Sequence, residues 1–159
     1  MNAKEVPIEL KKAWNSTSEI LLGKEVGEIS KYGDYLKEYT GKLVERSSTI
    51  SGKDVSISSS FVCKEAKIVD NEELKEYEKR TAKMKLNMNE VKDLDSILDA
   101  LEERFYYTGN AVLGNSFNVN KSDKCIDASY VYNSKMIYIS KYVAYSTLVR
   151  ECDYVFGSN

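Results

Sequence analysis

The hydrophobic and polar positions of the last third of the chain repeat every six residues. One column is apolar and runs Leu113, Val119, Cys125, Val131, Ile137, Val143, Val149 and Val155. Three places after each of these lies a small residue: Ser116, Ser122, Ala128, Ser134, Ser140, Ser146, Cys152 and Ser158. A helix would scatter such a column around its axis, and a flat strand would send the two columns to opposite faces. The spacing therefore predicts a β-solenoid of eight hexads over residues 111–159, with both columns facing inward.

The six-residue period resembles that of the left-handed hexapeptide β-helix proteins, whose triangular coils contain 18 residues. The resemblance covers residues 113–158 only. Members of that family commonly place glycine after the aliphatic residue and a small residue four places on. Here the small residue comes three places on, and glycine follows only Leu113. Many members are acyltransferases that use a histidine at a subunit interface, and this chain has no histidine.

Two coil geometries satisfy the period. With three hexads per coil, residues 18 apart stack, which places Ile137 next to Val155. With two hexads per coil, residues 12 apart stack, and Tyr130, Tyr142 and Tyr154 form a ladder. The alternation of tyrosines with aliphatic residues favours two hexads per coil, and the resemblance favours three. Between the two geometries we expect the triangular coil.

Residues 1–110 predict a helix-rich docking or capping domain, so that the whole chain belongs to the α+β class. Pro7 favours a short helix over Ile8–Trp14, and a second short helix follows the polar break at 15–18. Apolar residues three and four apart predict a helix over 25–46, with a break near Gly33 or Gly41. Alternation over 55–63 predicts a strand in a small pair near 49–63. Acidic residues at 70–73 predict the start of a charged helix over 72–85.

The strongest helical signal lies just before the repeat. Its apolar stripe is spaced for one helix face and consists of Leu94, Ile97, Leu98, Leu101 and Phe105. We expect this stripe to be buried and the helix to cover the first coil of the solenoid, because solenoids usually need a cap at an exposed end.

Composition narrows the classes of function. The chain has 159 residues, with 23 basic and 25 acidic side chains and a formal charge of −2, which argues against a polybasic arm for nucleic acid or anionic lipid. No apolar run approaches a membrane span, and the N-terminus lacks the apolar middle of a signal peptide. Without histidine, and without a phosphate loop or a ligand cluster, we expect no catalytic, cofactor or metal site. The cysteines Cys63, Cys125 and Cys152 show no ligand-like pairing, which favours reduced thiols in the cytoplasm or in an assembled particle.

Twelve tyrosines are the unusual feature of the composition. Those of the repeat are candidates for a ligand or partner surface: Tyr130, Tyr132, Tyr138, Tyr142, Tyr145 and Tyr154. Tyrosine combines an apolar ring with a polar tip and is enriched at contact surfaces. The alternative is that these rings stack along the solenoid and stabilise neighbouring coils.

The pattern favours a structural or assembly protein, a repeat scaffold that associates with itself or with a virion, tail or surface lattice. Alternatives are a carbohydrate- or peptide-binding module and, last, a fragment of a hexapeptide-type transferase. Both columns stay in step to the last residues without a polar cap, so we expect either a longer polypeptide or another subunit to complete the stack. The expected association end consists of Val149, Cys152, Val155, Phe156 and Ser158.

Overall fold

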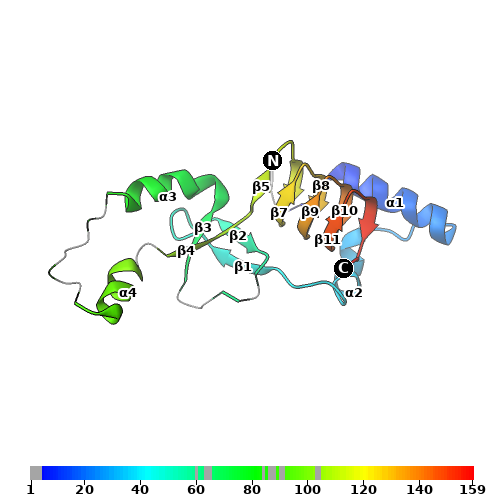
Figure 1. Cartoon of the computed structure of the whole chain (residues 1–159). Helices are drawn as coiled ribbons and strands as arrows, with labels where there is room; N and C mark the ends of the chain where they lie inside the picture. Colours follow the sequence, from blue (N-terminus) through cyan, green and yellow to red (C-terminus); the bar gives the residue numbers. More distant parts are fainter. Residues whose placement is uncertain are drawn as a thin grey trace.

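A computed structural model describes residues 5–59, 61–62, 66–83, 85, 89, 92–102 and 105–159. It confirms an α+β fold in which an N-terminal part that contains helices precedes a parallel β-solenoid (Figure 1). The N-terminal elements are α1 (Ile8–Leu22), the 3-10 helix η1 (Ile29–Tyr32), α2 (Gly33–Leu36), β1 (Val44–Ser47), β2 (Asp54–Ile57), β3 (Lys67–Asp70), the 3-10 helix η2 (Asn71–Glu73), α3 (Leu74–Thr81), α4 (Leu94–Glu102) and β4 (Tyr106–Gly109).

The solenoid is built from β5 (Val112–Leu113), β6 (Phe117–Asn120), β7 (Asp123–Ile126), β8 (Ser129–Tyr132), β9 (Lys135–Tyr138), β10 (Lys141–Ala144), β11 (Thr147–Arg150) and β12 (Asp153–Phe156). They form two parallel sheets, in the orders β12-β10-β8-β6 and β11-β9-β7-β5. Val131 pairs with Val143 and Val143 with Val155, so residues 12 apart stack. The expected triangular coil of 18 residues is therefore wrong, and each coil contains two hexads.

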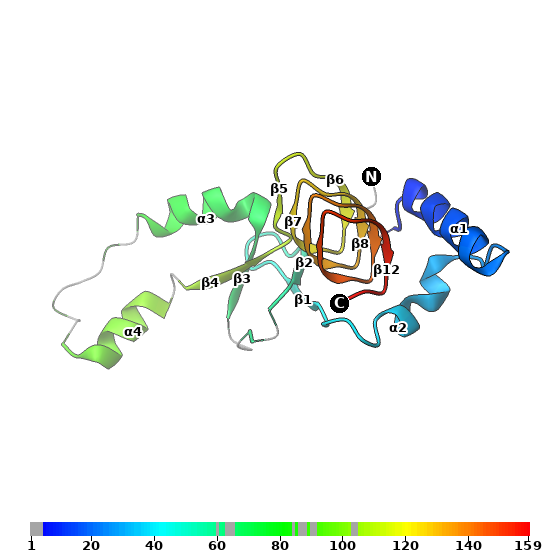
Figure 2. The same ribbon diagram turned by 45° about the vertical axis from the view of Figure 1, so that its right-hand side comes forward.

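Left-handed backbone at every third residue shapes the coil. From Asn118 to Gly157, every third residue has a φ between 48° and 70°. Each such residue turns the chain, and four turns close a coil with four sides (Figure 2). On each side, one of the two residues between corners faces inward and the next faces outward. Two opposite sides carry the paired strands, and the other two carry the small column.

The inward columns form the core as predicted, with one exception. Val131, Ile137 and Val143 are fully buried, and Val119 and Val155 in the end coils are half-buried. Leu113, however, is exposed, because Val112 and not Leu113 pairs with Cys125. An additional residue lies between Val112 and Val119, at the turn that Gly114 makes with a φ of 64°. The hexads are thus in register from Val119 onward.

The serines of the small column link successive coils. The Ser134 hydroxyl accepts the backbone N–H of Ser146 at 3.1 Å and donates to the Tyr132 carbonyl at 2.9 Å. Ser122 and Ser146 make the same two bonds, to Ser134 and Ser158 and to their own local carbonyls. The hydroxyls of these three inward serines are therefore satisfied inside the coil, which is why serine can fill an otherwise apolar interior.

Helix α1 covers one side of the solenoid, here called the helix side, whose outward residues are Asn120, Tyr132, Ala144 and Phe156. Leu10 is fully buried against Tyr132 and Ala144. The Asn120 amide donates to the Glu5 carbonyl at 2.8 Å beside the first coil, and Trp14 meets Phe156 edge-to-face at 5.3 Å in the last coil. The helix therefore runs along the solenoid from its first coil to its last.

A second segment crosses the next side, here called the strap side, whose outward residues are Asp123, Lys135 and Thr147. The Lys135 ammonium donates to the carbonyls of Lys42 and Ser58, at 3.2 and 3.3 Å. The Asp123 carboxylate accepts the backbone N–H of Ser58 at 2.7 Å and that of Ala111 at 2.9 Å. Burial lowers the pKa of Lys135, since the charged form loses water there. These bonds hold the chain at Lys42, before β1, and at Ser58, directly after β2, on the solenoid.

Several expectations for the N-terminal part are wrong in detail. The polar residues 15–18 do not break α1, because the Ser18 hydroxyl donates to the Asn15 carbonyl within the helix. Helix is confined to η1 and α2 in the segment 25–46, where Leu36 packs at Gly157. The strand pair is β1 with β2, and Cys63 lies outside the described residues. The charged helix ends at Thr81, and the parallel pair of β3 with β4 was not predicted.

Helix α4 forms where its apolar stripe predicts, but it does not cover the first coil. It lies at the far end of the N-terminal part from the solenoid (Figure 1). Its side chains Leu94, Ile97 and Leu98 are exposed, as is Phe105. The expectation of a buried stripe is therefore wrong, because periodicity predicts a helix face but not the surface that the face meets.

We predict that Val143→Asp unfolds the solenoid, since Val143 is fully buried and an unpaired charge there costs several kcal/mol. The matched control is Ile139→Asp, at an exposed corner where the preceding coil has Asp127. Thermal melting followed by circular dichroism measures both. Equal melting temperatures for Val143→Asp and the unmodified chain would contradict the inward assignment.

We also predict that Ser134→Ala lowers the free energy of unfolding by about 1–3 kcal/mol, because the buried N–H of Ser146 loses its acceptor. Ser158→Ala, at an exposed position of the last coil, should change it by less than about 0.5 kcal/mol. Urea titration of the two variants provides the comparison, and equal losses would show that the serine ladder does not stabilise the coil.

Candidate functional site

The last coil of the solenoid brings the expected association residues together. Val149 is buried, Val155 and Phe156 are half-buried, and Cys152 and Ser158 are exposed. They lie on or beside β11 and β12, each of which is the outermost strand of its sheet. An outermost strand presents a row of backbone N–H and C=O groups to whatever lies beyond it. We call β11 and β12, with the residues between and after them, the open end.

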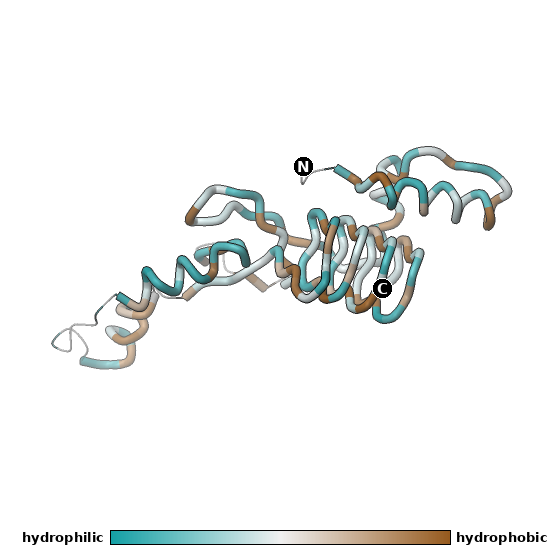
Figure 3. Tube along the Cα trace, turned by 90° about the horizontal axis from the view of Figure 1, so that it is seen from above, coloured by the Kyte–Doolittle hydropathy of each residue, from teal (hydrophilic) through white to brown (hydrophobic). Residues whose placement is uncertain are grey.

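Helix α1 extends past the open end. Trp14 lies over Phe156, and Leu21 follows seven residues later. At 1.5 Å per residue this is about 10 Å further along the helix, which equals about two strand spacings. The end of the helix therefore overhangs the last coil (Figures 1 and 3). The overhang presents Ile20, Leu21 and Leu22, which are 82%, 74% and 63% exposed.

The side opposite the helix side is here called the free side, and its outward residues are Leu113, Ile126, Tyr138 and Arg150. Tyr138 and Ile126 are half-buried, whereas Arg150 is exposed. At the corners of this side, Leu148 is 68% and Ile139 is 56% exposed. Among the described residues, the free side is thus a mixed surface, in which these apolar side chains lie beside charged corner residues and Arg150 pairs with Glu151 at 3.1 Å.

Tyr138 lies on the free side, and the other five candidate tyrosines divide into two groups. The rings of Tyr130, Tyr142 and Tyr154 stack at one corner, with centroids 5.1 and 4.8 Å apart. Tyr132 and Tyr145 are buried beneath the N-terminal segment, and burial raises the pKa of Tyr145 to about 12. Because the stacked rings cover each other's faces, the ladder offers mainly ring edges and hydroxyls outward. Tyr154 is the outermost ring of this stack and lies at the open end.

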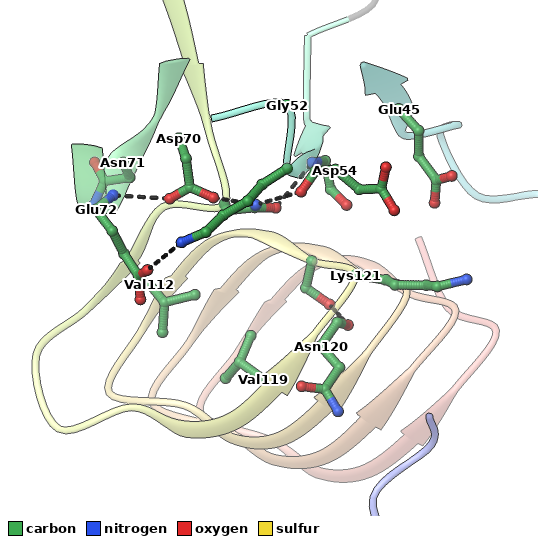
Figure 4. A pocket seen from close by; sticks show the side chains of 14 residues that line it. Glu45, Gly52, Asp54, Asp70, Asn71, Glu72, Val112, Val119, Asn120 and Lys121 are labelled. Carbon is green, nitrogen blue, oxygen red and sulfur yellow. Dashed lines mark hydrogen bonds and ion pairs between the residues drawn. The ribbon is translucent and has the colours of Figure 1, made fainter. Parts of the chain in front are cut away.

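The opposite end of the solenoid faces a pocket of about 740 Å³ (Figure 4). Val112 and Val119 of the first coil line one wall. The other wall is lined by residues on or beside the strands β1, β2 and β3, which are together called the β1–β3 unit. The Asp70 carboxylate accepts N–H groups of Glu72 and Asn110 there, and Lys53 pairs with Glu72 at 3.7 Å. These bonds occupy the most buried carboxylate of the pocket and fix the β1–β3 unit in front of the first coil.

Comparison with protein-family models, with curated proteins and with solved structures found no match for this chain. The helices of the described residues are all too short or too polar to span a bilayer. A search of the same residues found no group of three or more cysteine, aspartate or glutamate side chains placed to hold a metal ion.

Sequence reasoning missed the overhang and the free side. The predicted break at residues 15–18 divided α1 into two short helices, so the overhang was not predicted. The prediction also did not distinguish the outward residues of one strand-bearing side from those of the other. The sequence does contain a signal for the free side. The residue that follows each inward residue faces outward, and every twelfth residue of this kind lies on the same side: Ile126, Tyr138 and Arg150.

The two described cysteines should differ in reactivity. Burial raises the pKa of the Cys125 thiol to about 12, and the nearby Asp123 carboxylate acts in the same direction. Cys125 is therefore a protonated thiol at pH 8, while Cys152 is exposed at the open end. In a Cys63→Ser background, we predict that a maleimide at pH 8 modifies Cys152 alone. Mass spectrometry with and without urea measures this, and rapid modification of Cys125 in the folded protein would contradict it.

Proposed function

We propose that the protein is a non-catalytic scaffold that associates with itself through the open end of its solenoid. The observation that carries the proposal is the outermost position of β11 and β12 beside the half-buried Val155. Pairing with further strands would satisfy the backbone groups of this edge and remove Val155 from water. Further coils of the same polypeptide would satisfy the edge in the same way.

The structure around the first coil supports association through one end of the solenoid only. Its edge is occupied in part by the protein itself, because the Asp123 carboxylate binds the N–H groups of Ser58 and Ala111 and the β1–β3 unit lies in front of it. At the open end, the flanking α2 contacts only one corner, where Leu36 packs at Gly157. Association should therefore use the last coil and not the first.

We predict that light scattering after size-exclusion chromatography gives a mass above that of the monomer, increasing with protein concentration. Attachment of a bulky maleimide to Cys152, in the Cys63→Ser background, should return the protein to a monomer, because the adduct projects from the open end. Unmodified Cys63→Ser protein is the control. A monomer at all concentrations would contradict the proposed function.

A further inference from the structure

We propose that two copies of this chain join at their open ends in a two-fold dimer, in which the helix overhang of each copy covers the free side of the other. The inference rests on the proposed function and specifies its partner and geometry. Three observations lead to it: the outermost strands, the overhang, and the uncovered free side.

A head-to-tail stack is excluded by the overhang itself. In such a stack, the overhang of one copy would extend along the helix side of the next copy, over its first two coils. That space is already filled by the second copy's own chain, since Glu5 bonds to Asn120 there and Leu10 packs on Tyr132. The β1–β3 unit also lies in front of the first coil. The open end must therefore meet another open end.

For the strands of two open ends to pair, the two-fold axis must lie either perpendicular or parallel to the strands, because a diagonal axis would place strands on the sides that carry the small column. An axis perpendicular to the strands keeps both overhangs on the helix side, where the two helices would run into each other end to end. An axis parallel to the strands moves the partner's helix to the opposite side of the coil, which is the free side. In that arrangement β11 pairs antiparallel with the partner subunit's β12, and the two interiors close against each other at Val149 and Val155.

The surfaces brought together by this second axis are complementary. The overhang is long enough to reach about two coils past the interface, and Leu21 continues the helix face of Leu10 and Trp14 that packs on the solenoid. Ile20 and Leu22 lie about 100° to either side of it. The corresponding two coils of the free side carry Tyr138, Leu148 and Arg150. In this arrangement the apolar groups of both surfaces leave water. The contact occurs twice, as a closed two-fold interface requires.

The test uses two variants and their mixture. Leu21→Glu changes the overhang and Leu148→Lys changes the free side, and both residues are exposed in the monomer. Lysine suits this corner, because Lys124 occupies the equivalent corner of an earlier coil. Each variant alone should raise the dimer dissociation constant about 30-fold or more. A one-to-one mixture should restore the dimer, because one contact of the mixed dimer is unmodified and the other pairs glutamate with lysine.

The control is Leu94→Lys on α4, which has a similar exposure of 69% and lies far from the open end, and it should leave the dimer unchanged (Figure 1). Analytical ultracentrifugation of the full chain, with far-UV circular dichroism to confirm folding, gives the readout. A dimer insensitive to both variants, an unrestored mixture, or species larger than a dimer would overturn this geometry and leave the proposed function standing. A monomer at all concentrations would overturn both.

Discussion

The fold depends on the left-handed backbone conformation of every third residue between Asn118 and Gly157. For residues other than glycine this conformation costs about 1 kcal/mol or more each, so it persists only where neighbouring coils hold it in place. The regular spacing gives each side one inward and one outward residue, and four sides close the coil in 12 residues. The period of the sheets, the inward columns and the tyrosine ladder all follow from this one constraint.

A coil this narrow determines which residues can fill it. Its interior admits valine or isoleucine on two sides and serine or alanine on the other two, so larger side chains must lie outside. Tyr132 and Phe156 are therefore outward-facing apolar residues, and they need a cover of their own. The N-terminal segment supplies it, because Leu10 and Trp14 pack on this column along the length of the solenoid. The helix and the solenoid thus share one apolar surface, although they lie at opposite ends of the chain.

The solenoid and its inward residues could be predicted from the sequence, but the number of hexads per coil could not, because six divides both 12 and 18. A signal did exist: Asn118, Asp127 and Asn133 favour left-handed backbone and share one phase of three. It was masked by Tyr130, Met136 and Ile139 at the same phase, residues with no such preference. The prediction of a helix over 25–46 was wrong for another reason. Ile29, Tyr32 and Leu36 have helical spacing, but Ile29 and Leu36 pack with residues of the distant solenoid, which no local pattern shows.

Only the part of the candidate site that follows from the repeat itself could be predicted. Residues of the last coil could be identified, because the columns of the repeat reach Val155 and Ser158 without change. The overhang could not, since it depends on where α1 lies along the solenoid and not on any property of Leu21 itself. With about four coils, two of the coils are end coils, and their edges expose a large share of a small core. At the first coil, Asp123 and the β1–β3 unit cover part of this edge. At the last coil, the outermost strands lie beside exposed apolar side chains of the overhang and the free side. Removal of these groups from water is what would drive the association proposed above.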